Sequence, residues 1–185
     1  MTADDSAVDR ADIAADLERA RIEFHRLLSY AERHDAWAKP TRGTRWTNEQ
    51  LLFHMVFGYM IVARLLILVK VFSRLPHQVS RAFAGLLNAA TKPFDAINYY
   101  GSCAAALVHN RRRMGAKMDR VIAGLQRKLV REPEDALHRG MHFPTRWDPF
   151  FKDYMTLEEV YCYPGEHFDF HKHQLALTSA TAWMP

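Results

Sequence analysis

Cysteine, glycine and proline are all scarce in this chain, and each scarcity argues against a class of protein. The 185 residues include two cysteines, Cys103 and Cys162, which form no C-x-x-C pair. A disulfide framework is therefore excluded, and we expect both thiols to be reduced. With eight glycines and eight prolines, the chain also has no glycine-rich phosphate loop, no G-x-S-x-G sequence and no H-E-x-x-H sequence.

Strand-like alternation of apolar and polar residues is not sustained anywhere, whereas apolar residues recur with helical spacing. The chain is 49% hydrophobic and 25% charged, with a formal net charge of +4. It is too apolar and too weakly charged for a disordered protein. Its length is that of one domain with its own core. We therefore predict an all-α protein in which residues 1–185 form a single domain.

The sequence also predicts neither a secretory signal nor a membrane span. The first six residues, Met1 to Ser6, are acidic and contain no apolar run, so we predict no secretory signal. The most apolar stretch, Leu51 to Val71, contains Arg64. An arginine in the middle of a membrane span costs about 2.5–3.5 kcal/mol. We therefore interpret this stretch as a buried helix and expect a cytoplasmic protein with no membrane partner.

Two helix starts carry the same sequence signal. Thr47 is followed three residues later by Gln50, which is the pattern of a capping box. Thr156 and Glu159 repeat the pattern near the end of the chain.

Prolines and glycines set the remaining helix boundaries. The predicted helices cover about Ala7–Trp37, 47–73, Tyr100–Arg131 and 156–178. A long connection, 76–98, joins the second helix to the third and contains a short amphipathic piece, Val79–Ala90. Pro164-Gly165 is expected to kink or divide the last helix.

Histidine is the one residue type in surplus, with ten copies. His167 and His171 are spaced i, i+4, so they project from one face of a helix. At 1.5 Å per residue, His54 lies about 10 Å inside the second helix and His171 about 10 Å from the end of the last. The three share one level only if these helices run antiparallel. The second and third helices are then parallel, which predicts an up-down-down-up four-helix bundle with a long crossover between helices 2 and 3.

Three imidazoles at one level suit a divalent transition metal whose fourth position stays open to water or substrate. We therefore predict His54, His167 and His171 as metal ligands. A core histidine satisfied by a hydrogen bond is the alternative interpretation of His54. A second i, i+4 pair, His138 and His142, is expected in a loop, where the rings are exposed or cap a helix.

The sequence GTRWTNEQLLFHM at residues 43–55 resembles the W-[ST]-x-x-E/Q-x-L-x-H-[LM] start of the second helix in the DinB-like superfamily. These DinB/YfiT-type metalloenzymes are distinct from the similarly named DNA polymerase. The sequence HFDFH at residues 167–171 resembles the second half of the superfamily signature, H-x-x-x-H. The resemblance covers the whole helix plan. It implies an up-down-down-up four-helix bundle, often dimeric, that binds a divalent ion through three histidines.

The resemblance also implies a function, because some members are transferases or isomerases that use bacillithiol, mycothiol or glutathione. It implies a small-molecule substrate, Zn or Ni as the metal, a thiol co-substrate such as mycothiol, and a homodimer. A thiol-dependent S-transferase or isomerase acting on a small electrophile is the leading hypothesis. A non-catalytic metal- or ligand-binding stress or resistance protein is the alternative, and a helical module with incidental histidines is a third.

Candidate catalytic residues beside the ligands are few, and the sequence assigns none of them. Glu166 and Asp169 flank the histidine pair, either as hydrogen-bond partners of an imidazole or as surface residues. His109 is a candidate fourth ligand or acid–base group, or a surface residue. Cys103 is interpreted as a small buried residue rather than a nucleophile.

Positive charge is concentrated in residues 109–131, which hold eight bases and one acid, whereas residues 1–23 hold seven acids and three arginines. The bases point in several directions around a helix and no aromatic residue lies among them, so we expect no nucleic-acid partner. A solvated helix partly facing the acidic first helix is the preferred interpretation. The aromatic-rich segment Glu132–Met155 is expected at the end of the bundle far from the metal.

Overall fold

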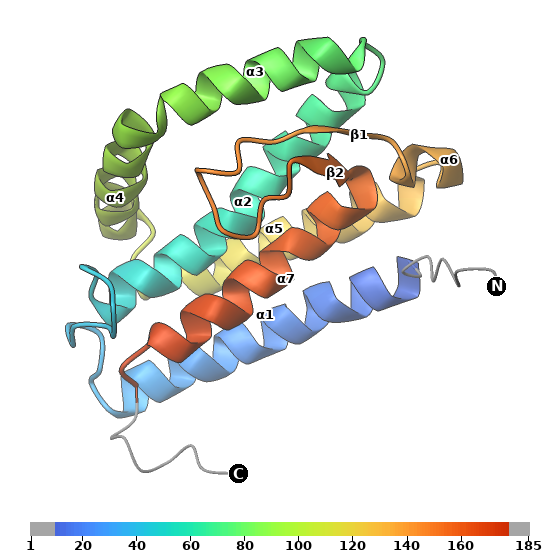
Figure 1. Ribbon diagram of the computed structural model, residues 1–185. Coiled ribbons are helices and arrows are strands. Elements are labelled where there is room, and N and C mark those ends of the chain that lie inside the picture. The colour runs from blue at the N-terminus through green and yellow to red at the C-terminus, as the bar shows by residue number, and fades with distance from the viewer. Residues whose placement is uncertain (1–9, 178–185) are drawn as a thin grey trace, which may run out of the picture.

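Helices dominate the computed structural model, which describes residues 10–177 (Figure 1). The all-α prediction is confirmed for these residues, apart from a small antiparallel sheet of two three-residue strands. The predicted start of the first helix at Ala7, the predicted end of the last at Thr178 and the acidic segment Met1 to Ser6 lie outside the described residues. The elements are α1 (Arg10–Arg33), α2 (Asn48–Phe72), α3 (His77–Ala89), α4 (Thr91–Val108), α5 (Met114–Arg131), α6 (Glu134–Leu137), β1 (Gly140–His142), β2 (Tyr154–Thr156) and α7 (Leu157–Gln174).

The two predicted capping boxes are confirmed at the starts of α2 and α7. The Thr47 hydroxyl accepts a hydrogen bond from the Gln50 amide at 3.4 Å, and the Gln50 side chain accepts one from the Thr47 amide at 3.0 Å. The equivalent distances for Thr156 and Glu159 are 3.2 and 2.9 Å. These side chains satisfy amide groups that have no partner within the first turn of a helix.

Contacts at both ends of α2 and α7 show that these helices run antiparallel. The buried Asn48 side chain, in the first turn of α2, donates to the Ala176 carbonyl and accepts from the Ala176 amide just beyond α7. It also donates to the Ala36 carbonyl at 2.7 Å. At the other end, the Glu132 carboxylate accepts hydrogen bonds from both Lys70 of α2 and Tyr161 of α7.

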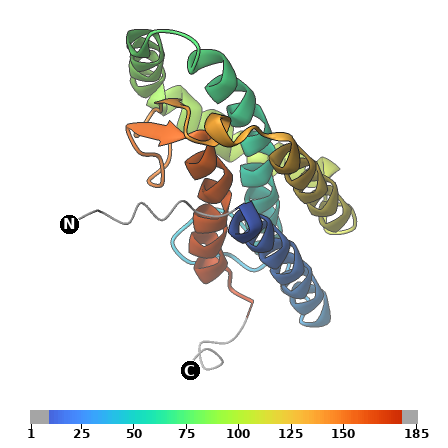
Figure 2. The ribbon, with the colours of Figure 1, turned by 90° about the vertical axis from the view of Figure 1, so that its right-hand side faces the viewer.

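The remaining long helices pack alongside this pair (Figure 1, Figure 2). α1 runs in the same direction as α7, because Asp16 lies at Gly165 and Arg19 pairs with Asp169 one turn further along. α5 runs parallel to α2, since the Lys128 ammonium donates to the Ala63 carbonyl and Glu132, just after α5, pairs with Lys70 near the end of α2. α3 and α4 connect α2 to α5 and lie on the far side of α2 from α1 (Figure 1).

The predicted third helix, Tyr100–Arg131, is wrong as a continuous element. The chain leaves α4 at His109 and re-enters a helix at Met114. Asn110 accounts for the break, because its side-chain oxygen accepts a hydrogen bond from the Arg112 amide and so competes with the helical backbone pattern. The Glu49 carboxylate of α2 accepts another from the Arg111 amide.

Pro164 does not divide α7, which is continuous from Leu157 to Gln174. Gly165 has a packing role instead, because a Cβ atom there would lie 2.3 Å from the Asp16 carboxylate of α1. The Pro-Gly sequence therefore does not divide the helix. Its glycine allows α1 to approach α7 closely.

α2 is long and apolar enough, by length and composition, to cross a membrane, and more than half of its most apolar window is buried against the rest of the protein. The basic segment 109–131 contains α5, which packs against α1 as expected for a helix that partly faces the acidic first helix. The ion pairs between α1 and α5 join the single acid of that segment, Asp119, to Arg21 and His25 of α1. The bases of α5 therefore do not supply these ion pairs.

Candidate metal centre

The three predicted histidines meet between α2 and α7. One nitrogen from each of His54, His167 and His171 can be chosen so that all three lie within 4.8 Å of one another. The ring centroids are 4.4 Å apart for the pair on α7 and about 5 Å from His54 to each of them, at 5.1 and 4.9 Å. We refer to these residues as the three-histidine cluster. A group of this kind can hold a metal ion.

Burial keeps the cluster neutral. The three residues are between 4% and 9% exposed. Burial, and then the nearby His171, lowers the pKa of His54 to about 3. Burial also lowers the pKa of His167 well below its ordinary value and lowers that of His171. Neutral imidazole is the form that binds a metal, so the cluster is in its ligating state at neutral pH.

Hydrogen bonds orient two of the rings. His54 Nδ1 is bonded to the Ser102 hydroxyl of α4 at 3.2 Å, and His171 Nδ1 to the side-chain oxygen of Gln174 at 2.6 Å. Because that oxygen is an acceptor, Nδ1 of His171 carries the proton and Nε2 keeps its lone pair. Such partners fix the ring orientation and tautomer of metal-binding histidines. Ser102 and Gln174 are thus part of the site, and the sequence assigned a role to neither.

The unpaired ring nitrogen of His167 shows whether the cluster suits a metal. The Nδ1 atom of this residue is buried and has no hydrogen-bond partner among the described residues. An unpaired buried polar atom is costly, and a metal ligand bond would satisfy a ring nitrogen of this kind. Gly58 of α2 makes room for the ring, because a Cβ atom there would lie 2.9 Å from His167 Nδ1.

Aromatic rings cover the cluster on the side of the loop before α2. The Trp46 indole stacks on His54 with 4.4 Å between centroids and meets His171 edge-on at 6.4 Å. Tyr99 of α4 also stacks on Trp46 at 6.0 Å, and the Arg45 guanidinium lies 4.5 Å from the Tyr99 ring centroid. The tryptophan of the helix-start motif therefore helps to shield the cluster.

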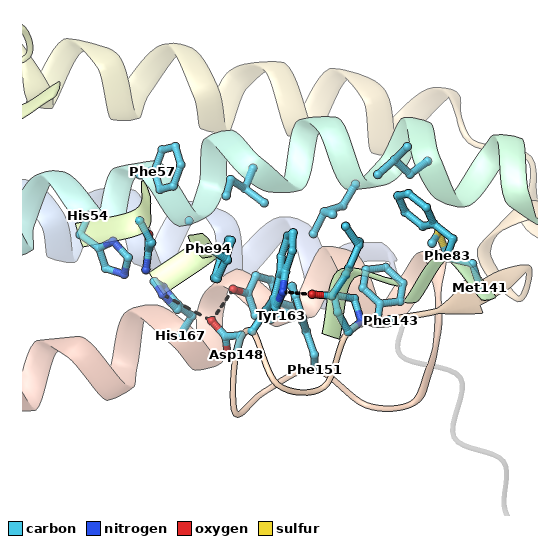
Figure 3. A pocket seen from close by; sticks show the side chains of 18 residues that line it. His54, Phe57, Phe83, Phe94, Met141, Phe143, Asp148, Phe151, Tyr163 and His167 are labelled. Carbon is cyan, nitrogen blue, oxygen red and sulfur yellow. Dashed lines mark hydrogen bonds and ion pairs between the residues drawn. The ribbon is translucent and has the colours of Figure 1, made fainter. Parts of the chain in front are cut away.

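Asp148 lies close to the cluster, and the sequence interpretation missed it. One of its carboxylate oxygens is 3.9 Å from His167 Nε2 (Figure 3). The same oxygen accepts a hydrogen bond from the Tyr163 hydroxyl at 2.8 Å, and the other accepts one from the Phe150 amide at 2.9 Å. Burial raises the pKa of Asp148, although both hydrogen bonds oppose the shift.

Asp148 was missed because its segment was assigned to the wrong end of the molecule. Residues 143–151 do not lie far from the histidines. They fold over α2 and α7, and Trp147 stacks on Phe94 of α4 at 3.9 Å and donates its indole N–H to the Leu87 carbonyl of α3. The prediction for the segment Glu132–Met155 is therefore wrong in this respect. The one sequence signal that could have indicated Asp148 as a site residue was an aspartate within an aromatic-rich loop.

The other sequence candidates lie away from the cluster. Asp169 forms an ion pair with Arg19 at 3.0 Å, and Glu166 is exposed on α7. His109 ends α4 and stacks on Phe53 at 5.7 Å, outside the cluster. His142, expected in a loop, is instead buried in β1 and paired with Asp153.

A cavity of about 120 Å³ begins at His54 and His167 and follows α2 away from them (Figure 3). Its walls come from α2, α3, α4, α7 and residues 141–151. Most of the lining side chains are aliphatic or aromatic hydrocarbons. The three-histidine cluster is therefore the polar end of an otherwise apolar cavity.

Comparisons of the chain with protein-family models, with curated proteins and with solved structures find no match. The functional proposals below are therefore based on the geometry of the cluster, on the cavity beside it and on the sequence motifs.

Proposed function

We propose that this chain is a divalent-metal-dependent enzyme of the DinB-like superfamily. The observation that carries the proposal is a buried, neutral cluster of three histidines at the polar end of an apolar cavity. The pairwise directions of α1, α2, α5 and α7 support an up-down-down-up four-helix bundle, with α3 and α4 as the crossover. The two motifs that resemble the superfamily supply the three histidines.

The metal in this proposal is Zn or Ni, held by His54, His167 and His171. Three histidine ligands with an open fourth position are the usual arrangement of a catalytic zinc site. When bound, such an ion lowers the pKa of water or of a thiol and supplies a nucleophile near neutral pH. Ser102 and Gln174 orient two of the rings, and Trp46 with the cavity wall restricts the access of water.

The proposed reaction is an S-transfer or an isomerisation in which a low-molecular-weight thiol, such as mycothiol, acts on a small electrophile. The apolar cavity supports an uncharged substrate body rather than a highly polar one. Asp148 faces His167 from the cavity side, held by Tyr163 and the Phe150 amide. In this proposal, Asp148 positions the reacting groups beside the three-histidine cluster.

A non-catalytic metal- or ligand-binding protein is the second candidate, and one observation favours it. Asp148 is the one carboxylate among the described residues that line the cavity, so the chain offers few groups for proton transfer. A stress or resistance protein that only sequesters a ligand needs no more than the cluster and the cavity.

Metal analysis and a turnover assay test the proposal together. Purified protein loaded with Zn or Ni is expected to hold one ion per chain, and His54→Ala and His171→Ala are expected to lose it. His173→Ala is the matched control, because His173 is exposed on the same helix. Full metal content in both cluster variants would overturn the site.

Turnover then separates the enzyme from the binding protein. Metal-loaded protein is mixed with mycothiol, bacillithiol or glutathione and an electrophile such as 1-chloro-2,4-dinitrobenzene. Loss of thiol that depends on the metal and on His54 supports the enzyme. A stable metal site without consumption of any thiol favours the binding protein.

A homodimer is part of the proposal, and exposed apolar side chains on α4 support it. Ile97 and Leu107 are 70% and 80% exposed. Static light scattering of the purified chain is expected to give twice the monomer mass, and a monomer mass at micromolar concentration would contradict this.

A further inference from the structure

The shape and chemistry of the cavity indicate what kind of molecule occupies it. Its α2 wall is built from side chains at positions 57, 61, 65 and 68, which recur every three or four residues on one helical stripe. From His54 to Leu68 this stripe covers about 20 Å of helix at 1.5 Å per residue. The cavity is thus elongated along α2, with the three-histidine cluster at one end (Figure 3).

The titratable and amide side chains of this cavity lie toward its cluster end. Asp148 lies beside His167, and Asn98 is on α4 one turn before Ser102, which bonds His54. At the other end, Phe83, Met141 and Phe143 close the cavity with apolar atoms alone (Figure 3). The Trp147 indole N–H is already paired, because it donates to the carbonyl of Leu87, another residue of the cavity wall.

We propose that this cavity binds the alkyl chain of the substrate and that the reactive head group of the same molecule lies at the three-histidine cluster. The position of the reactive head group rests on the proposed function, whereas the binding of the alkyl chain does not. A dry cavity of about 150 Å³ holds the six carbon atoms of benzene, so the 120 Å³ here accommodates about five carbon atoms. The elongated outline favours a linear chain over a ring. The substrate class is therefore a small electrophile with an alkyl chain of about five carbons.

The first experiment measures how affinity depends on chain length. Straight-chain alkyl hydroxamic acids from two to ten carbons carry one metal-binding head group and are titrated by calorimetry into Zn-loaded protein. Each added methylene is expected to tighten binding about fourfold up to about five carbons, and binding is expected to level off beyond that length. Affinity that does not change with chain length would overturn the proposal.

Two substitutions on α2 localise the effect. Ile61→Trp places an indole in the middle of the cavity wall and is expected to abolish the chain-length dependence while binding of the two-carbon hydroxamate persists. Ile67→Trp is the matched control, since Ile67 is 49% exposed and does not line the cavity. Equal chain-length dependence in the two variants would contradict the assigned position.

A variant at the apolar end keeps the test valid if Ile61→Trp does not fold. Phe83→Ala is expected to lengthen the cavity and to move the levelling point from about five carbons to about seven or more. An unchanged levelling point in folded protein would count against the proposal.

Metal-free protein separates this proposal from the proposed function. In the presence of chelator, straight-chain alcohols from three to eight carbons are expected to bind with the same chain-length dependence, although more weakly. If alcohols show it but no metal binds, the cavity assignment stands and the enzyme proposal fails. If metal and the two-carbon hydroxamate bind but chain length has no effect, the enzyme proposal stands and the alkyl-chain proposal fails.

Discussion

Gly58 and His167 illustrate how much the candidate site depends on single residues. The imidazole of His167 occupies the space that a side chain at position 58 would fill, with 2.9 Å between Nδ1 and the position of a Cβ atom. The helix-start motif ends before this glycine, and nothing in the sequence around it indicates a close approach by α7. The lack of a side chain at position 58 of α2 therefore determines where the His167 ring can lie.

Replacement of Gly58 by alanine is expected to weaken metal binding by about tenfold or more, because displaced ligands and lost orientation typically have effects of that size. The helix itself should tolerate alanine, which is favoured over glycine by about 1 kcal/mol in a helix interior. Zinc affinity is measured by competition with a chromophoric chelator. Gly85→Ala on α3 is the control, since no atom lies within 4 Å of its Cβ position, and equal affinities in the two variants would contradict the prediction.

His54 is expected to make the metal-free protein sensitive to acid. Its pKa is about 3 in the folded protein against 6.5 for the unperturbed group, so between these values the unfolded chain binds a proton that the folded chain does not. The free energy of unfolding therefore falls as the pH drops below about 6.5, by up to about 1.4 kcal/mol per pH unit for this residue.

Urea unfolding in chelator at pH 7, 6 and 5 measures this contribution. The His54→Gln variant is expected to show a shallower loss of stability toward low pH than the parent protein. His173→Gln, altered at an exposed histidine of α7, is expected to retain the parent slope. Identical slopes for all three proteins would show that His54 remains protonated or exposed in the folded state.

At the scale of helices and strands, the capping boxes give the clearest link between sequence and structure. Thr47→Ala removes the acceptor for the first-turn amide of α2 and is expected to cost about 1 kcal/mol of stability. Thr47→Ser keeps the hydroxyl and is expected to retain most of that contribution. The comparison is made by urea unfolding, and equal losses in the two variants would mean that the threonine methyl group, not the hydrogen bond, stabilises this end.

The elements that were predicted correctly are those with local determinants. Both capped helix starts, the antiparallel pairing of α2 with α7 and the meeting of the three histidines follow from spacing and cap residues within each segment. The break at Asn110 was missed because a side chain that competes for one backbone amide leaves little trace in hydrophobic periodicity. Asp148 was missed for a different reason, since its position depends on long-range contacts of Trp147 with α3 and α4.

At the scale of the whole molecule, a bound ion would join the first third of the chain to its last tenth. A ligand that binds only the folded state at 1,000 times its Kd stabilises a protein by about 4 kcal/mol. For a chain of this size that corresponds to a rise in Tm of about 10 °C. Differential scanning fluorimetry with and without zinc is expected to show this rise in the parent protein. A His54→Ala, His171→Ala double variant that gained the same stability would place the metal elsewhere.

Asn48 gives the cluster a property that does not depend on the ion. Its buried amide joins the start of the α1–α2 link, the first turn of α2 and the backbone just beyond α7, so the two helices that carry the three histidines are aligned before any metal arrives. Zinc fingers, by contrast, are unfolded without their metal. The entropy cost of ordering the three histidines is therefore incurred when the chain folds, and not when the ion binds. Removal of the ion by a chelator should therefore leave the near-ultraviolet circular dichroism of the protein unchanged, and reloading should be rapid and complete.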